Sequence, residues 1–156
     1  MSTLGVRNVF NLRQINMKII FAADGSGCTK KALAFLVTHE NLAGTDDELL
    51  VLNVQARVLL GMLPTVSPDM VSEYYRDEAN RILDPIKTFL DRHPIRYRCE
   101  WVVGSAAEEI IEAGKRAKAQ LIVMGTHGHS PIGRMLLGSV AQRVIAECDV
   151  PVLLVK

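Results

Sequence analysis

Short apolar runs alternate with longer segments of helical spacing throughout residues 17–156. This alternation is typical of repeated βαβ units, in which helices join parallel strands. We therefore expect a single-domain α/β fold, with an open five-stranded parallel sheet covered by helices on both faces. The expected strands are 17–23, 48–54, 95–103, 120–125 and 150–155, and the expected helices are 28–41, 68–92, 106–118 and 139–147.

The apolar pattern of each strand predicts its place in the sheet. The runs at 17–23, 48–54 and 120–125 are almost continuously apolar, as in central strands that helices cover on both faces. In 95–103, apolar and charged residues alternate, which is typical of an edge strand. The last run contains Pro151, which cannot donate a ladder hydrogen bond and therefore indicates the other edge.

The last expected strand is an apolar edge, and proteins normally cover such edges. Pairing with the same strand of a second copy would satisfy its exposed backbone groups and bury its side chains. We therefore predict a homodimer through residues 150–155. Packing of this strand under a loop is the alternative.

The length of 156 residues suits one domain rather than two. With 49% hydrophobic and 22% charged residues, the composition excludes a largely disordered or collagen-like chain. The formal net charge of +1 provides no overall field that would attract nucleic acid or an anionic membrane. No apolar run approaches the roughly 18 residues that a transmembrane helix needs.

The three cysteines, Cys28, Cys99 and Cys148, are far apart and form no C-x-x-C pair, so neither a disulfide framework nor a cysteine zinc site is indicated. A cytoplasmic location fits this pattern best. Residues 1–16 contain no apolar segment of the kind found in secretory signals. We treat them as an N-terminal extension without assigned function, either a loose arm or an ordered functional segment.

The loop after the first expected strand begins with Asp24 and is rich in small residues. It matches neither a P-loop nor a dinucleotide fingerprint, because Lys30 occupies the position where both motifs need a glycine. Ser26 or Thr29 can cap the helix that follows. Asp24 either belongs to this turn or contacts the ribose or a phosphate-bound metal of a nucleotide.

The loop after the fourth expected strand contains Gly125, Gly128, Gly133 and Gly138. Glycine lets backbone N–H groups approach an anion closely, and the loop ends at a helix start whose free N–H groups favour phosphate. Thirteen residues separate the expected strand and helix, and connections of this length are usually functional or disordered. A phosphate cradle is therefore indicated, with turn formation and helix capping by Ser139 as the alternative.

The spacing Gly125-x-x-Gly128, nine residues, then Gly138-Ser139 matches the G-2x-G-9x-G-(S/T) signature and resembles the ATP-binding universal stress proteins. The resemblance extends from about Met17 to Lys156. Other segments that resemble this family are 121–128, 151–155, Asp24-Gly25-Ser26 and Val103-Gly104-Ser105. Gln120 departs from the family pattern, in which Asp commonly precedes the fourth strand.

This resemblance implies an adenine nucleotide alpha hydrolase-like fold with strand order 3-2-1-4-5, a dimer through the fifth strand, and bound ATP, AMP or ADP with Mg²⁺. Adenine would contact the backbone around Ala23 and Val54, and Asp24 would lie near the ribose and phosphates. The binding residues that it implies are Ala23, Asp24, Val54, Met124, Gly125, Thr126, His127, Gly128, Gly138, Ser139 and Val140.

These expectations describe an ATP-binding regulatory protein of the stress response. No general base other than Asp24 is apparent, so we assign no catalytic residue and expect any hydrolysis to be slow. A slow ATP-hydrolysing or phosphate-transferring enzyme and a nucleotide-independent protein-interaction module are the alternatives. His127 and His129 lack a third nearby ligand for a metal. The apolar segment 58–66 either covers the nucleotide, meets a protein partner or packs as a satellite of the core.

Overall fold

The computed structural model describes residues 16–39, 42–59, 65–128 and 137–156. Strands and helices alternate along these residues. In chain order they are β1 (Lys18–Ala22), α1 (Gly27–Thr38), β2 (Glu48–Gln55), α2 (Pro68–Leu90), β3 (Arg96–Val103), α3 (Ala106–Ala117), β4 (Leu121–Gly125), α4 (Ser139–Glu147) and β5 (Val152–Val155).

All five strands are parallel and lie in the order β3-β2-β1-β4-β5. This arrangement confirms the fold class, the strand order and the assignment of β3 and β5 to the two edges. The order reverses beside β1, because β2 and β3 extend from one side of β1 while β4 and β5 extend from the other. This reversal places a topological switch point between β1 and β4.

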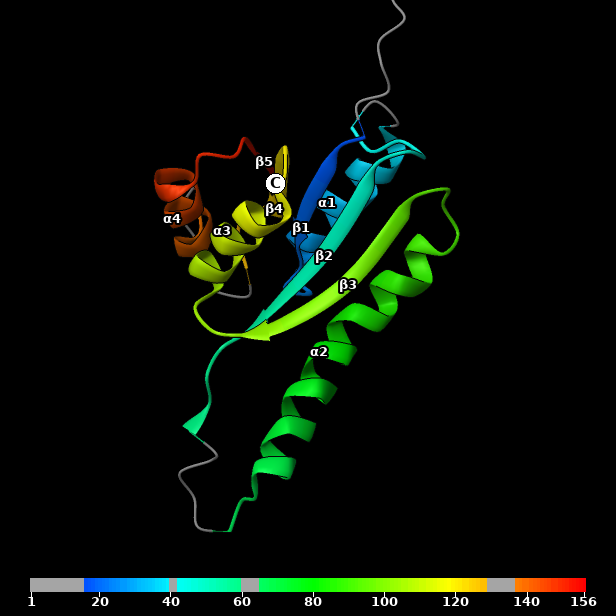
Figure 1. Ribbon diagram of the computed structural model, residues 1–156. Helices are drawn as coiled ribbons and strands as arrows, with labels where there is room; N and C mark the ends of the chain where they lie inside the picture. Colours follow the sequence, from blue (N-terminus) through cyan, green and yellow to red (C-terminus); the bar gives the residue numbers. More distant parts are fainter. Residues whose placement is uncertain (1–15, 40–41, 60–64, 129–136) are drawn as a thin grey trace, which may run out of the picture.

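Helices cover both faces of the sheet (Figure 1). Since side chains along a strand alternate between faces, β1 serves two cores. Its Ile19 and Phe21 are buried with side chains of α1 and α2, whereas Ile20 is buried with side chains of α3 and α4. The largest buried side chains of the two cores come mainly from β1, β2 and β4, as expected for central strands.

Element boundaries differ from the sequence expectations by a few residues, for local reasons. Ser26 caps α1, since its Oγ accepts a hydrogen bond from Thr29 N at 3.2 Å, so the helix begins at Gly27. The strand β5 begins only at Val152, although the carbonyl of Pro151 already accepts from Ile122 N at 2.9 Å. Within the described residues, no helix has the length and apolarity required to cross a membrane.

The edge strand β3 is attached to the C-terminal end of α2. The Tyr97 hydroxyl donates to Asp91 Oδ1 at 2.5 Å and to the Lys87 carbonyl at 3.3 Å. The hydrogen bond to Asp91 raises the pKa of Tyr97 to about 12, because the neutral phenol is the donor. From this attachment, α2 extends beyond the carboxyl ends of the strands (Figure 1). On the extending part of α2, the Tyr75 hydroxyl accepts a hydrogen bond from Val58 N at 2.9 Å.

Candidate functional site

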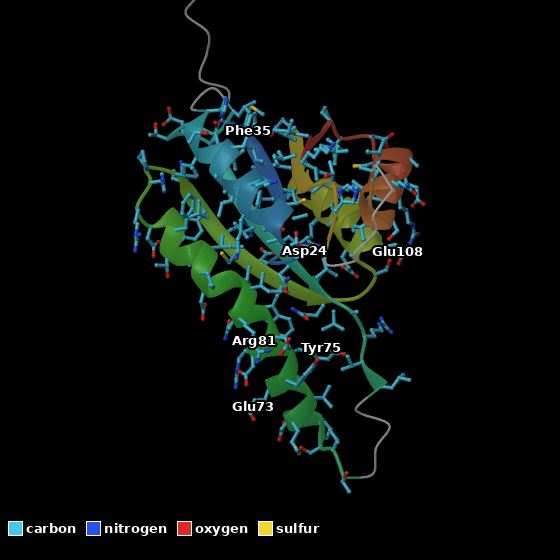
Figure 2. The ribbon with its side chains drawn as sticks, turned by 180° about the vertical axis from the view of Figure 1, so that it is seen from behind. Asp24, Phe35, Glu73, Tyr75, Arg81 and Glu108 are labelled. Atoms are coloured by element: carbon cyan, nitrogen blue, oxygen red, sulfur yellow. The ribbon has the colours of Figure 1, made fainter. Side chains whose placement is uncertain are left out.

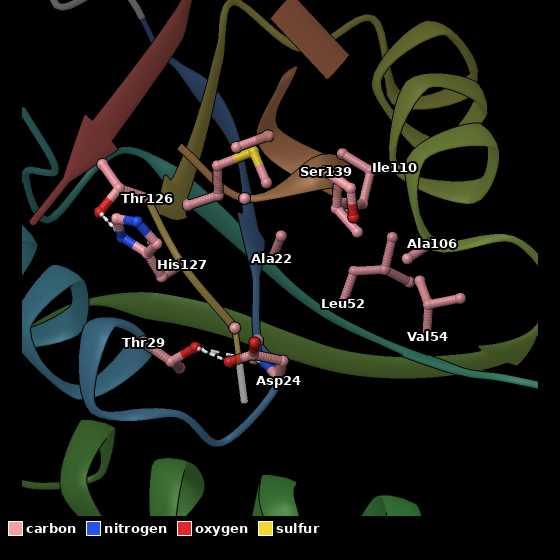
Figure 3. A pocket seen from close by; sticks show the side chains of 17 residues that line it. Ala22, Asp24, Thr29, Leu52, Val54, Ala106, Ile110, Thr126, His127 and Ser139 are labelled. Atoms are coloured by element: carbon pink, nitrogen blue, oxygen red, sulfur yellow. Dashed lines mark hydrogen bonds between the residues drawn. The ribbon is translucent and has the colours of Figure 1, made fainter. Parts of the chain in front are cut away.

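A cavity of about 280 Å³ lies at the carboxyl ends of β1 and β4, beside the switch point. In open parallel sheets, ligands bind at this place. Its wall is built from the ends of β1, β2 and β4, the turn after β4, and the first residues of α1, α3 and α4 (Figure 3). The fold therefore brings well-separated parts of the chain to one candidate site.

Every residue that the sequence assigned to nucleotide binding lines this cavity. They are Ala23, Asp24, Val54, Met124, Gly125, Thr126, His127, Gly128, Gly138, Ser139 and Val140. The cavity thus unites the two glycine-rich loops that the sequence singled out, together with the end of β2. Whether these residues bind a nucleotide stays a prediction.

Six further lining residues were not assigned to binding from the sequence: Ala22, Thr29, Leu52, Ala106, Ile110 and Ala141. Leu52 could have been found, because it lies two residues before Val54 and so shares its face of the strand. Ala106 and Ile110 lie in the first half of α3, and no motif marks them. Only the packing of α3 beside α4 brings them to the cavity.

Asp24 is held by the turn that leads into α1. Its Oδ1 accepts hydrogen bonds from Ser26 N at 2.9 Å and from Thr29 Oγ1 at 2.5 Å, and Figure 3 shows the second of these. Gly25 has a φ of +78°, a conformation that favours glycine. The two roles considered for Asp24 are therefore compatible, since it stabilises the turn and also lines the cavity.

The turn after β4 lies directly against this first loop. A Cβ on Gly128 would lie 2.8 Å from Asp24 Oδ2, and a Cβ on Gly125 would lie 2.6 Å from Cys28 Cβ. Both distances are too short for ordinary van der Waals contact. The glycines of the signature therefore allow two loops, distant in sequence, to form one wall.

The start of α4 completes the polar side of the cavity. Gly138 N donates to the Thr126 carbonyl at 2.7 Å, and Gly138 is the N-cap residue, without a side-chain capping bond. The alternative that Ser139 caps α4 is wrong, because Ser139 is already the first helical residue. The N–H groups of this first turn have no intrahelical acceptor, and the positive end of the helix dipole favours an anion there.

Another part of the cavity wall is apolar, and in Figure 3 its Ile110 lies beside Ser139 at the start of α4. Figure 3 shows Leu52, Val54, Ala106 and Ile110 together on one side, with Thr126 and His127 across from them. An apolar wall facing polar groups is suited to an amphiphilic ligand, such as a nucleotide with its flat base and charged phosphates.

The backbone of Ala23 is already largely engaged. Its N–H donates to the Leu52 carbonyl at 2.9 Å, and its carbonyl accepts from Asn53 Nδ2 at 2.8 Å. One lone pair of that carbonyl is left for a ligand. A ligand near Ala23 could therefore hydrogen-bond to this backbone only as a donor, for example through an amine.

Among the described residues, no cluster of three His, Cys, Asp or Glu side chains has the arrangement of a metal site. The Thr126 hydroxyl lies 2.9 Å from His127 Nδ1. His129, which the sequence offered as a candidate metal ligand, and residues 60–64 lie outside the described residues. The described remainder of segment 58–66 does not line the cavity.

The geometry is that of an open, doubly wound α/β domain with an amphiphilic small-molecule cavity at its switch point. The chain belongs to the universal stress protein family, whose family model matches residues 16–156. It is 33% identical over 153 residues to universal stress protein MJ0531 of Methanocaldococcus jannaschii, a match that covers 97% of this chain and 86% of that protein.

Solved structures show the same fold. The structure of protein MJ0577 of the same archaeon is 27% identical, covers 90% of this chain and 96% of that one, and has a TM-score of 0.77. A universal stress protein from Archaeoglobus fulgidus was solved in complex with dAMP; it is 22% identical, with 90% and 98% coverage and a TM-score of 0.60. A family member from Arabidopsis thaliana with AMP bound is 16% identical, with 90% and 91% coverage and a TM-score of 0.64.

Proposed function

We propose that this protein binds an adenine nucleotide in the switch-point cavity and acts as a nucleotide-dependent regulator in the stress response. One observation carries this proposal: a single cavity joins an apolar wall to the N-terminus of α4 and to Asp24. Membership of the universal stress protein family and the AMP and dAMP bound to two proteins of the same fold support it.

The cavity residues fit the separate parts of a nucleotide. The base would pack on the apolar side, against Leu52, Val54 and Ile110, and its amine could donate to the Ala23 carbonyl. The phosphates would accept hydrogen bonds from the N–H groups of Ser139 and Val140 at the start of α4. Among the lining residues that the structure describes, Asp24 is the only carboxylate.

A single carboxylate at the phosphate side fits Mg²⁺ binding only in combination with the nucleotide. Mg²⁺ commonly binds through one or two carboxylates together with substrate phosphates and water. Asp24 would thus supply one oxygen, and ATP the others. Since Asp24 is also the hydrogen-bond acceptor of its own turn, it is a poor general base, and we expect binding with at most slow hydrolysis.

The same proposal includes a homodimer through β5 and a cytoplasmic location. All four residues of β5 are only half-buried in the single chain, and the strand lies at the edge of the sheet. A second copy would cover both the edge and these apolar side chains. The three free cysteines fit a reducing compartment.

Calorimetric titration of the nucleotide-stripped protein tests the binding. We expect saturable binding of ATP with Mg²⁺ and of AMP, and weaker binding of GTP, which has a carbonyl where adenine has its amine. Gly138→Ala should weaken ATP binding about tenfold or more, because the added Cβ lies 3.2 Å from the Thr126 carbonyl and disturbs the start of α4.

Gly27→Ala is the matched control, because a Cβ on Gly27 meets no atom within 4 Å and Gly27 does not line the cavity. This variant should bind ATP as the unmodified protein does. Absence of binding of any adenine nucleotide to the unmodified protein would contradict the proposal, as would equal affinities of both glycine variants.

A further inference from the structure

A second cavity, of about 520 Å³, lies on the opposite face of the sheet, between α1 and α2. Its volume is within the range of about 300–1,000 Å³ that is usual for small-molecule sites. Figure 2 shows this face, with Asp24 at the start of α1 and Arg81 on α2. The nucleotide proposal makes no use of this cavity.

The floor of the second cavity is apolar. Leu33 of α1 and Ile86 of α2 form part of it, and they are only 5% and 7% exposed. Ile82, Pro85 and Phe89, also from α2, complete the apolar wall. A ligand here would therefore be held mainly by apolar contact.

Among the described residues that line this cavity, three are charged, namely Asp24, Lys30 and Arg81, and two of them already have partners. Arg81 pairs with Glu78 at 2.8 Å, and the Asp24 carboxylate accepts hydrogen bonds from Ser26 N and Thr29 Oγ1. Lys30, which is exposed, forms no ion pair with any residue that the structure describes. The lining thus presents one uncompensated ammonium beside an apolar groove.

We propose that the cavity between α1 and α2 binds an amphiphilic carboxylate, a molecule with one anionic head and an aliphatic or aromatic body. The body would lie on Leu33, Ile82 and Phe89, and the carboxylate would pair with the Lys30 ammonium. Such a ligand complements the cavity. Its uncharged body places no charge in the apolar groove, and its anionic head pairs with the Lys30 ammonium.

The second cavity adjoins the turn that carries Asp24. Asp24 and Thr29 line both cavities. Gly25 packs on Ile82 closely enough that a Cβ on this glycine would lie 3.2 Å from Ile82 Cγ1. A molecule resting on Ile82 would therefore lie beside the turn that forms part of the first cavity.

Calorimetric titration of the nucleotide-free full chain with decanoate, below its micelle-forming concentration, tests the proposal. We expect saturable binding of one decanoate per chain. Ile82→Trp should abolish it, because the larger side chain fills the groove. Lys30→Gln should weaken decanoate binding about two- to fivefold, as expected for one exposed ion pair, and should leave binding of the uncharged decanol unchanged.

Lys31→Gln is the matched control, since Lys31 is an exposed residue of the same helix that does not line the cavity. It should bind decanoate as the unmodified protein does. The proposal is overturned if decanoate shows no saturable binding, if folded Ile82→Trp binds it unchanged, or if the two lysine variants behave alike. Lys30 and Ile82 line the second cavity but not the first, so these outcomes do not depend on the proposed nucleotide site.

Discussion

Asp24 is one of two residues, with Thr29, that line both cavities. Its carboxylate closes the turn into α1 through Ser26 and Thr29, and it lies so close to the turn after β4 that position 128 has no room for a side chain. A residue with these contacts is fixed in place in the absence of a ligand. Such preorganisation limits the entropy lost on binding.

Asp24→Asn tests whether Asp24 supports a phosphate-bound Mg²⁺. Asparagine keeps an oxygen that can accept from Ser26 N and Thr29 Oγ1, but it removes the negative charge. We expect the affinity for ATP with Mg²⁺ to fall about tenfold or more, and the affinity for AMP without Mg²⁺ to change much less.

Both affinities can be measured by calorimetry. Asp46→Asn, on an exposed turn before β2, is the charge-matched control and should leave both unchanged. An equal loss of ATP and AMP affinity in Asp24→Asn would show that Asp24 acts through the turn rather than through a metal.

The glycines of the signature illustrate what sequence can and cannot provide at this scale. Their spacing along the chain is sufficient to single out Gly125, Gly128 and Gly138. The partners that require glycine at two of these positions, Cys28 and Asp24, are about 100 residues away in the chain. Only the folded arrangement shows which atom excludes a side chain at each place.

At the scale of single elements, edge strands and helix starts have the clearest consequences. The apolar or alternating pattern predicted whether each of the first four strands is central or at an edge, and Pro151 indicated an edge for the fifth; the sheet order confirms all five assignments. Helix ends were less predictable. The helix expected at 28–41 ends at Thr38 in the structure. Its end was hard to predict because helix propensity changes gradually along a sequence, whereas capping contacts are local and specific.

The edge strand β5 carries a prediction about assembly. Val152→Lys places a charge on the outer apolar edge, where a second copy would pair, and charged residues discourage edge-to-edge association. We expect the unmodified protein to sediment as a dimer and the variant to sediment as a monomer. A monomeric unmodified protein at every concentration accessible to sedimentation velocity would contradict the proposed dimer.

The overall architecture follows from features that act over short distances in the chain. Few sheet orders are possible once strands alternate with helices, the connections are parallel crossovers, and each strand is known to be central or at an edge. The eleven predicted site residues all line one cavity. This follows because the carboxyl ends of parallel strands lie at the same end of the sheet.

The remainder could not be predicted because it depends on packing between distant elements. Ala106 and Ile110 reach the first cavity through the position of α3 beside α4, where Arg143 of α4 pairs with Glu108 of α3 at 2.8 Å. The second cavity similarly depends on the spacing between α1 and α2. Ile82 and Phe89 appear in the sequence simply as core positions of an amphipathic helix.

The proposed function requires that an adenine nucleotide bind with its phosphate at the start of α4. The most direct measurement follows the backbone amide signals of ¹⁵N-labelled protein by NMR as AMP is added. We predict that the largest shifts occur at Gly128, Ser139 and Val140, with smaller shifts at Val54. Shifts confined to residues lining the cavity between α1 and α2, such as Lys30 and Ile82, or no shifts at saturating AMP, would contradict the proposed function.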